Sequence, residues 1–506
     1  MKRQKGQANR MQNNKQIAVI GAGISGLSAA AYLANAGFQV DIYEKHASPG
    51  GRARQFSAAG YTFDMGPSWY WMPDVFERFF QDFGSRVSDW YRLRLLDPAF
   101  EMVFSEGETL HIPDDFSGLC RLFESREPGS AARLADFMRL AQFKYERAMA
   151  DVVYKPGLHF TELLDPKLVS AVLRFQLFSS IRRQVRRNFR HPHLVALMEF
   201  PILFLGAMPA STPALYTLMN YAGLKLGTWY PEGGFGAVAK GIAGQAERNG
   251  ARIFYNTEIR RIVTRGNRVT GIEAGGKVIP YDGVVAAGDY SNMEASLLPA
   301  EFRNYGKEYW QRKTFAPSCL LFYLGLRKTF PSLGHHTLFF EEDLDAHALD
   351  IYKTPVWPSK PLFYVCRTTA SDKTVAPVGH DNLFLLMPVA TGLSDSSLTR
   401  EAYFELMANR IMRRLGEDIR PYIDYKRSYS ITDFIEDYGA YRGNAYGLAN
   451  TLLQTAIFKP KIRNRKLPNL VYSGQLTVPG PGVPPALISG KVAANILAGH
   501  FKTKIE

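Results

Sequence analysis

The chain has 506 residues, of which 46% are hydrophobic and 21% charged, which excludes a disordered protein or a small binding module and predicts two to three domains. Its three widely spaced cysteines exclude a disulfide framework and a cysteine-based zinc site, and they are consistent with a reducing compartment. The net charge of +14 is concentrated in residues 1–15 and between Asp165 and Glu199, and because no nucleic-acid-binding motif accompanies these patches, they favour an anionic lipid surface.

The first elements alternate between strand and helix. Residues 1–15 are polar and basic, and they predict a disordered leader without a signal peptide. Ile17–Ile20 predicts a short buried strand, and Leu27–Ala36 predicts a helix. Val40–Tyr43 predicts a second strand, which completes a βαβ unit.

The rest of the chain is helical first and then mixed. Residues 75–231 predict mainly helices, among them a basic amphipathic helix at Leu168–Arg190. Residues 298–466 contain short strand patterns such as Leu383–Met387, followed by a predicted helix at Thr399–Leu415. No apolar stretch reaches the length of about 18 residues that a spanning helix needs.

A glycine-rich motif connects the first strand to the first helix. Residues 21–26 read GAGISG, and Glu44 ends the second strand 18 residues after Gly26. This context matches the dinucleotide-binding fingerprint, in which Gly21 permits the tight turn and Gly23 lets a pyrophosphate approach the backbone. The helix N-terminus favours phosphate, and the carboxylate of Glu44 is suited to the ribose hydroxyls of an adenosine.

Two further segments favour FAD over NAD. Gly50-Gly51-Arg52 follows Glu44 and adds phosphate-facing backbone and a guanidinium group. Near the C-terminus, residues 470–473 predict a strand, and residues 474–498 predict a Gly/Pro-rich loop followed by a helix. A helix N-terminus placed at the pyrimidine edge of a flavin would stabilise the reduced ring.

These elements predict an α/β fold with discontinuous domains. We expect a Rossmann-type FAD-binding domain, a helical membrane-contacting region at 75–231 and an α+β substrate-binding domain at 298–466. The FAD-binding domain is expected to comprise residues 16–74, 232–297 and 467–502.

The chain resembles the bacterial-type phytoene desaturases, a carotenoid desaturase family within the flavin amine oxidase superfamily. The resemblance covers about Lys15 to His500 and is most specific in Gly60–Ser68 and in the closing Pro-Gly-Pro-Gly-Val-Pro segment. The motif segments that carry it are 18–44, 49–54, 60–68, 233–236, 284–289, 443–448 and 474–490.

The resemblance implies which residues bind FAD. Gln475 departs from the acid that is usual at its position, but an amide can still hydrogen-bond the ribitol. The implied cofactor-binding residues are Gly21, Ala22, Gly23, Ser25, Gly26, Glu44, Lys45, Gly51, Arg52, Gly66, Pro67, Ser68, Ile259, Gly474, Gln475 and Val483.

The resemblance also implies the chemistry, which is hydride transfer from allylic carbons of phytoene to flavin N5 and the stepwise introduction of double bonds toward lycopene or a shorter product. The sequence shows no catalytic triad, metal cluster or paired carboxylates. Asp64 is a weak candidate for a polar group near the flavin, and a capping or turn role is equally consistent with its position. The aromatic residues that we expect either along a substrate tunnel or in ordinary core packing are Trp69, Tyr70, Trp71, Trp229, Tyr230 and Tyr446.

A water-insoluble polyene must come from a bilayer, so we expect a peripheral, monotopic protein on the cytoplasmic side of a membrane, with oxygen or a quinone as electron acceptor. Phe178, Ile181, Val185 and Phe189 form one stripe of the Leu168–Arg190 segment, opposite several arginines. The alternative is a core-packed helix with a solvated arginine face.

Other activities remain open at this point. A related enzyme could act on dehydrosqualene or a hydroxylated carotenoid, isomerise a carotenoid or saturate retinol, because the fold does not distinguish these reactions. A prenyl-protein-binding protein like the Rab GDP-dissociation inhibitors has the same architecture, but the intact fingerprint and Glu44 argue against it. A soluble amine oxidase would require a polar amine cage.

Overall fold

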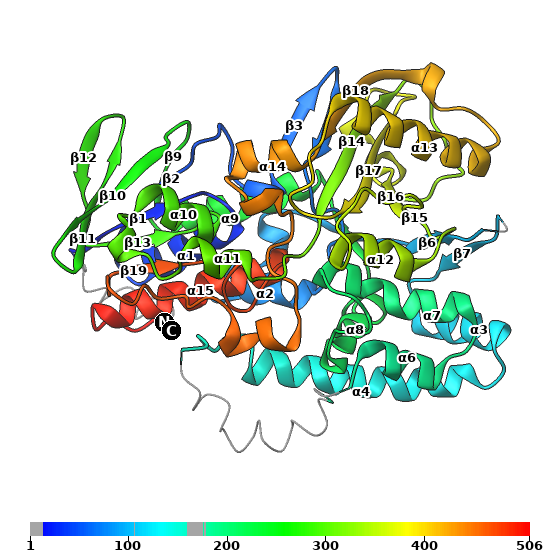
Figure 1. Ribbon diagram of the computed structural model, residues 1–506, viewed down its shortest axis with the longest axis horizontal. Helices are drawn as coiled ribbons and strands as arrows, with labels where there is room; N and C mark the ends of the chain where they lie inside the picture. The colour runs from blue at the N-terminus through cyan, green and yellow to red at the C-terminus, as the bar shows by residue number, and fades with distance from the viewer. Residues whose placement is uncertain (1–13, 106, 159–175, 177–178, 506) are drawn as a thin grey trace, which may run out of the picture.

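The computed structural model describes residues 14–105, 107–158, 176 and 179–505 (Figure 1). A parallel five-stranded sheet with the order β19-β13-β1-β2-β9 organises one side of the molecule. Segments that are far apart in the sequence thus meet in a single sheet. Its strands are β1 (Gln16–Ile20), β2 (Gln39–Tyr43), β9 (Arg252–Phe254), β13 (Gly283–Ala286) and β19 (Leu470–Tyr472).

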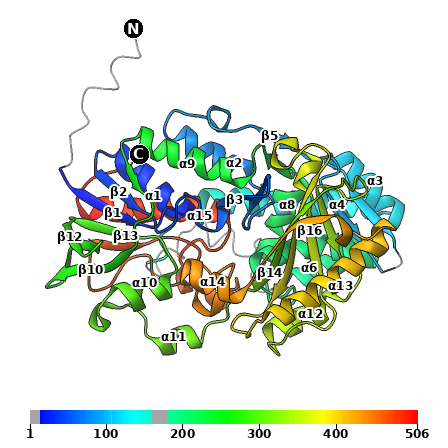
Figure 2. The same ribbon diagram turned by 90° about the horizontal axis from the view of Figure 1, so that it is seen from above.

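Helices α1 (Ile24–Asn35), α9 (Phe235–Arg248) and α15 (Val483–His500) pack together beside this sheet (Figure 2). Ile17 and Val19 of β1 belong to the core on the helical side, whereas Ala18 and Ile20 belong to the core on the opposite side. The strand is therefore apolar from Ile17 to Ile20, because both of its faces are buried there. The opposite face carries α10 (Tyr290–Leu297) and an antiparallel sheet of β10 (Ile259–Arg265), β11 (Arg268–Ala274) and β12 (Lys277–Pro280).

A second sheet of seven strands forms the other side of the molecule, in the order β18-β14-β17-β16-β15-β6-β7. Helix α13 (Ser397–Leu415) covers one of its faces, and α12 (Leu344–Tyr352) lies at its edge (Figure 1). The strands are β6 (Phe100–Val103), β7 (Thr109–Ile112), β14 (Ser318–Leu326), β15 (His336–Phe339), β16 (Phe363–Cys366), β17 (Asp381–Val389) and β18 (Ile423–Tyr429).

The central strands of this sheet alternate between two environments. Leu320 and Phe322 of β14 pack in the cluster that includes α13, whereas Leu321 on the same strand faces the interior of the molecule. On β17, Leu385 and Leu386 divide in the same way. Because the side-chain period of a strand is two, one face of the sheet holds the helix and the other is free to form a wall.

The region 75–231 is mainly helical, with α3 (Phe116–Arg126), α4 (Ser130–Asp151), α6 (Ile181–Asn188), α7 (Pro192–Glu199) and α8 (Leu218–Leu224) below the seven-stranded sheet in Figure 1. It also contains strands that the helical pattern does not predict, since β6 and β7 extend the seven-stranded sheet. The other α-helices and strands in the described residues are α2 (Pro73–Gln81), α11 (Lys307–Gln311), α14 (Ile431–Tyr438), the hairpin of β3 (Gln55–Ala58) and β4 (Tyr61–Asp64), and the antiparallel pair of β5 (Leu93–Leu95) and β8 (Trp229–Pro231).

The predicted membrane helix at Leu168–Arg190 is only partly within the described residues, and Phe178 lies outside them. The part that is described, α6, has its apolar stripe in the protein core, since Ile181, Val185 and Phe189 are each at most 1% exposed. The expectation that these three residues contact a membrane is therefore wrong, because neighbouring protein segments bury them. The alternative of a core-packed helix with outward arginines holds for this segment. In the described part of the chain, no helix is long and apolar enough to span a bilayer.

Candidate cofactor and substrate site

The glycine-rich turn has the geometry that the fingerprint requires. Gly21 has a φ of +104°, and α1 begins three residues later at Ile24. A Cβ on Gly26 would lie 2.1 Å from the carbonyl oxygen of Gly21, so no larger residue fits there. A Cβ on Gly51 would lie 3.2 Å from the Cα of Gly23, so the two glycine segments run close together. The exposed backbone forms a cradle for a phosphate group.

Glu44 is held at the end of β2 by this turn. Its side chain is 5% exposed, and its two carboxylate oxygens accept hydrogen bonds from the Ala22 amide at 2.8 Å and from the His46 amide at 3.0 Å. Both bonds fix the direction of the carboxylate toward the cavity that it helps to line. Such an acidic group, fixed at the edge of a phosphate cradle, fits a ribose diol.

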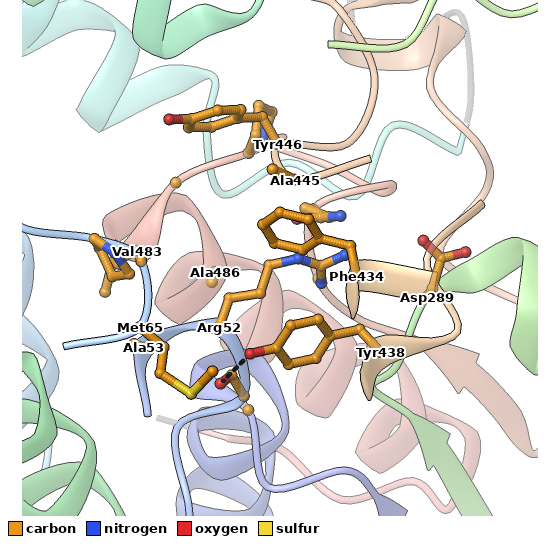
Figure 3. Close-up of a pocket in the computed structure, with 18 of the residues that line it drawn as sticks. Arg52, Ala53, Met65, Asp289, Phe434, Tyr438, Ala445, Tyr446, Val483 and Ala486 are labelled. Atoms are coloured by element: carbon orange, nitrogen blue, oxygen red, sulfur yellow. Dashed lines mark hydrogen bonds between the residues drawn. The ribbon is translucent and has the colours of Figure 1, made fainter. Parts of the chain in front are cut away.

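Arg52 lies beside the ring of Tyr438, with its guanidinium carbon 4.9 Å from the ring centre (Figure 3). Its Nη2 donates to the Asn444 carbonyl at 3.2 Å, but its buried Nε has no hydrogen-bond partner among the described residues. Burial lowers the pKa of Arg52, although the nearby carboxylate of Asp289 favours the charged form. An unpaired buried donor beside the glycine cradle is what a bound anionic cofactor would satisfy.

These elements open onto one cavity of about 950 Å³ that extends from the glycine turn to the seven-stranded sheet. Its charged lining residues are all contributed by the segments around the glycine turn, β10, α10, α14 and their loops. Among the described residues from 298 to 430, none that lines the cavity is Asp, Glu, Lys or Arg. The wall there is apolar and includes Leu321, Leu338, Phe340, Leu344, Ile351 and Leu386.

One titratable residue on this wall, His347, has a neutral side chain because of its burial and its hydrogen bonds. Its Nε2 donates to the Pro388 carbonyl at 2.9 Å, and its Nδ1 accepts from the Leu362 amide at 3.0 Å. Burial lowers its pKa to about 4. The substrate end of the cavity therefore presents no charge at neutral pH in the part of the wall that the structure describes.

Most of the predicted cofactor residues meet in this cavity. Ala22 and Gly26 do not line it, because the Ala22 amide is used by Glu44 and Gly26 packs beneath the turn. The predicted residues that line it are Gly21, Gly23, Ser25, Glu44, Lys45, Gly51, Arg52, Gly66, Pro67, Ser68, Ile259, Gly474, Gln475 and Val483.

Asp64 does not lie in this cavity. Its carboxylate accepts from the amides of Phe235 at 2.9 Å and Gly236 at 3.2 Å, at the N-terminus of α9. The structure shows the capping role, and Asp64 lines only a small second cavity, together with Gly66 and Ser68. Burial raises the pKa of Asp64 to about 6, against the effect of these hydrogen bonds.

Half of the aromatic residues expected along a substrate tunnel or in the core line the cavity. Trp69, Trp71 and Tyr446 line the cavity, whereas Tyr70, Trp229 and Tyr230 do not. Tyr70 is fully buried and stacks on Phe76, which is ordinary core packing.

The sequence offered no signal for several residues that the fold brings to the site. Tyr438, at the end of α14, donates a hydrogen bond from its hydroxyl to the Gly51 carbonyl at 3.3 Å, although 387 positions separate the two residues (Figure 3). Behind the cavity wall, His335, His336 and Cys366 bring potential ligand atoms within 4.8 Å of one another. Both groups depend on long-range pairing, which spacing along one chain does not reveal.

The profile of flavin containing amine oxidoreductases matches residues 24–498. This chain belongs to that family. It is 39% identical to a carotenoid 3,4-desaturase of Haloarcula japonica, over 96% of this chain and 98% of the relative. It is 30% identical to a zeta-carotene-forming phytoene desaturase of Myxococcus xanthus, over 96% and 94%. It is 28% identical to a 4,4'-diapophytoene desaturase of Staphylococcus haemolyticus, over 95% and 98%.

Solved structures agree on the fold. An oxidoreductase of Methanosarcina mazei has a TM-score of 0.60 at 16% identity, with 94% of this chain and 99% of that one covered. A putrescine oxidase variant has a TM-score of 0.60 at 16% identity, with 96% and 99% covered. The family membership and the relatives establish a FAD-dependent oxidoreductase of the carotenoid desaturase type. The glycine cradle, Glu44 and the unpaired Arg52 Nε fit FAD.

Proposed function

We propose that this enzyme introduces a carbon–carbon double bond at the 3,4 position of an already conjugated acyclic carotenoid, with phytoene as the second candidate substrate. The observation that supports an uncharged polyene most directly is the separation of charge along the cavity. All the charged lining residues lie near the predicted cofactor positions, and the wall formed by β14–β17 and α12 carries none among the described residues. Such a wall suits a hydrocarbon and offers no partner for an amine.

The order of similarity supports the choice among polyenes. The identity is 39% to a relative named as a carotenoid 3,4-desaturase, against 30% to one named as a phytoene desaturase. The family resemblance on its own predicts phytoene, so both substrates enter the test. Desaturation of dehydrosqualene or a hydroxylated carotenoid, carotenoid isomerisation and retinol saturation remain the further alternatives.

The contribution of the chain to the reaction is positioning and exclusion of water. FAD supplies the acceptor for the hydride that leaves an allylic carbon. The glycine turn, Glu44 and Arg52 hold the cofactor end, while Leu321, Leu386 and their neighbours keep the polyene in an apolar channel. Alignment of the reacting carbon in a dry site reduces the entropy cost of the step.

We further propose that the enzyme binds the cytoplasmic surface of an anionic membrane, where its substrate dissolves. Leu452, Leu453 and Phe458 support this, because these three large apolar side chains are exposed within one short segment, Leu453 to 71%. Replacement of Leu453 and Phe458 by Glu is expected to reduce sedimentation with anionic vesicles, whereas Leu398→Glu, at a site 83% exposed on α13, is expected to leave it unchanged.

The deciding experiment incubates the holoenzyme in liposomes with phytoene or with lycopene, under oxygen or with a quinone, and follows the pigments by absorbance and chromatography. Conversion of lycopene to a longer-wavelength product, with phytoene untouched, supports 3,4-desaturation. Stepwise products from phytoene support phytoene desaturation instead. If FAD is bound and neither carotenoid changes with either acceptor, both assignments fail, and the further alternatives are tested.

A further inference from the structure

A chain of hydrogen-bonded side chains leads from the cavity wall into the seven-stranded sheet. Ser68 Oγ lies 3.0 Å from Tyr364 Oη, and Tyr364 Oη lies 2.5 Å from His336 Nδ1. Ser68 and Tyr364 line the cavity, whereas His336 is 0% exposed. Ser68 directly follows Gly66 and Pro67, which the family resemblance places close to the flavin. The chain of hydroxyl groups therefore begins at the wall of the cavity that also contains the glycine turn.

His336 is held in a fixed orientation. Its ring stacks on Trp69 at 4.1 Å with an angle of 8° between the planes, and its backbone is paired with Cys366 across β15 and β16. Burial and the neighbouring His335 lower its pKa well below the ordinary value, so the ring is neutral. Burial raises the pKa of Tyr364 well above the ordinary value, so its hydroxyl keeps its proton. A protonated hydroxyl next to a neutral imidazole donates to Nδ1. Because burial disfavours the imidazolium, the ring can hold an extra proton only transiently and must then return it.

His347 shows that this arrangement is not a general property of histidines at the cavity. Both nitrogens of His347 are bonded to backbone groups, so it can neither accept nor pass on a proton without breaking one of those bonds. In contrast, Nε2 of His336 is buried and has no hydrogen-bond partner in the described part of the chain. An unused polar atom at the inner end of a hydrogen-bonded chain calls for a functional explanation.

A second, smaller cavity lies beside this chain of side chains. A second cavity of about 10 Å³, roughly the size of one water molecule, is lined by Ser68, Asp64, His335 and Cys366. Nε2 of His335 is also without a partner among the described residues, while its Nδ1 lies 2.8 Å from the hydroxyl of Ser371. Ser371 is partly exposed to solvent. The second cavity shares Ser68 with the chain of hydroxyl groups but is not lined by His336.

We propose that Ser68, Tyr364 and His336 form a relay that removes the proton released by desaturation. This inference rests on the proposed function, because only a desaturation releases such a proton. The oxidation takes a hydride from one carbon, for which FAD is the acceptor, and a proton from the adjacent carbon. The electron pair of the second C–H bond becomes the new π bond.

The proton moves by successive short transfers. It bonds to Ser68 Oγ while the hydroxyl proton of Ser68 passes to Tyr364 Oη and that of Tyr364 passes to His336 Nδ1. One C–H bond is broken and one N–H bond is formed, and both hydroxyl groups are restored. After the product leaves, the imidazolium returns its Nδ1 proton through Tyr364 and Ser68 to water that enters the cavity. In this scheme Ser68 is the catalytic residue that touches the substrate, and Tyr364 and His336 act through it.

Variants of the holoenzyme test the relay by anaerobic single-turnover reduction of bound FAD with the carotenoid that the wild type accepts. We expect Tyr364→Phe and Ser68→Ala to lower the rate about 100-fold, with the KM for the carotenoid unchanged. The solvent deuterium isotope effect of the wild type is expected to disappear in both variants. Tyr403→Phe is the matched control and is expected to retain the wild-type rate. Tyr403 lies on α13, and this variant loses only the hydroxyl that donates to the Pro358 carbonyl.

A second measurement does not depend on turnover. In 15N-histidine-labelled holoenzyme, we expect His336 to be a neutral ring whose Nδ1 accepts a hydrogen bond, and we expect this Nδ1 resonance to shift in Tyr364→Phe. Wild-type rates and isotope effects in both variants would overturn the relay while leaving the carotenoid assignment intact. A stoichiometric metal ion in the purified protein would also overturn it, because His335, His336 and Cys366 would then be ligands. A wild type without activity on any carotenoid would instead refute the proposed function.

Discussion

The two ends of the main cavity offer their proposed ligands different kinds of contact. The cofactor end uses backbone amides, the carboxylate of Glu44 and the guanidinium of Arg52, each in a position fixed by a turn or a hydrogen bond. The substrate end uses apolar side chains from strands and α12, and its described wall residues carry no charge. The first end tolerates almost no change in backbone geometry, while the second tolerates changes in shape but not in polarity.

This difference follows from what each ligand offers. A dinucleotide has phosphates and hydroxyls, so directional donors and acceptors at fixed distances provide its affinity. A polyene has no polar atom, so its affinity comes from the transfer of apolar surface out of water, which has no direction. Mutations at the two ends should therefore fail in different ways, and each of the following variants tests one side of this distinction.

The largest effect is expected for Gly26→Ala. The added Cβ would lie 2.1 Å from the Gly21 carbonyl oxygen, and because that oxygen is backbone, the whole turn must move. We expect a protein that purifies without FAD, as measured by its absorbance near 450 nm, and that is therefore inactive. Gly499→Ala, where a Cβ meets nothing within 4 Å, is the control and should retain the yellow colour. FAD at wild-type occupancy in Gly26→Ala would contradict the proposed cradle.

The next largest effect is expected for Leu386→Glu at the opposite end. A carboxyl group on the apolar wall must be desolvated when a polyene binds, which costs several kcal/mol. We expect kcat/KM for the carotenoid to fall at least about 100-fold, while FAD content stays unchanged. Leu398→Glu places the same charge on a site that is 83% exposed and should change neither quantity. Loss of FAD from Leu386→Glu would show that the two ends are not separable.

A smaller effect is expected for Arg52→Met, which keeps an unbranched apolar stem but removes the guanidinium group and its charge. The guanidinium supplies a charge-assisted hydrogen bond worth about 1.5–3 kcal/mol, so FAD should bind about 10- to 100-fold more weakly. Titration of the apoprotein with FAD, followed by flavin fluorescence, measures this change. Arg413→Met, at an exposed position of α13, is the matched control. If activity at saturating FAD also falls to zero, Arg52 acts on more than affinity.

The two ends also differ in how well the sequence predicts them. The cofactor end could be predicted because its residues lie in contiguous motifs whose spacing is set by a tight turn, as in Gly21 to Gly26 and Gly50 to Arg52. The first βαβ unit and the helix after Gly482 appear where the pattern predicts them. The exceptions, Ala22 and Gly26, belong to the same motif but lie under the turn rather than at its surface.

The substrate end could not be predicted residue by residue. Its wall depends on the pairing of β14, β16 and β17, and the apolar pattern of these strands is continuous because both of their faces are buried. The sequence therefore does not say which residues face the cavity and which face α13. An apolar stripe such as that of α6 is likewise compatible with contact to a membrane or to the protein core. Only the packing of the chain shows that Ile181 and Val185 lie in the core.

Asp64 belongs to neither end of the main cavity, because it caps α9 outside it, and its substitution should have the smallest effect on activity. Asp64→Asn keeps an acceptor for the α9 N-terminus and lies outside the main cavity, so kcat/KM for the carotenoid should stay within about twofold of the wild type, which corresponds to about 0.4 kcal/mol. A large loss of kcat with FAD still bound would restore a catalytic role for this carboxyl group.

The free energy of unfolding of Asp64→Asn should depend on pH differently from that of the wild type. Burial raises the pKa of the Asp64 carboxyl from 3.8 to about 6, so the folded state binds its proton more tightly than the unfolded state does. Between these two values, the unfolding free energy of the wild type gains up to about 3 kcal/mol from this group as the pH falls. Asp64→Asn has no titratable group at this position and cannot gain this stability. The difference in unfolding free energy between the two proteins should therefore shift in favour of the wild type when the pH falls from 7.5 to 4.5. Urea denaturation of both holoenzymes at the two pH values measures this difference. A difference that is constant with pH would mean that this carboxyl is as acidic in the folded protein as in the unfolded chain, and that α9 is capped at no electrostatic cost.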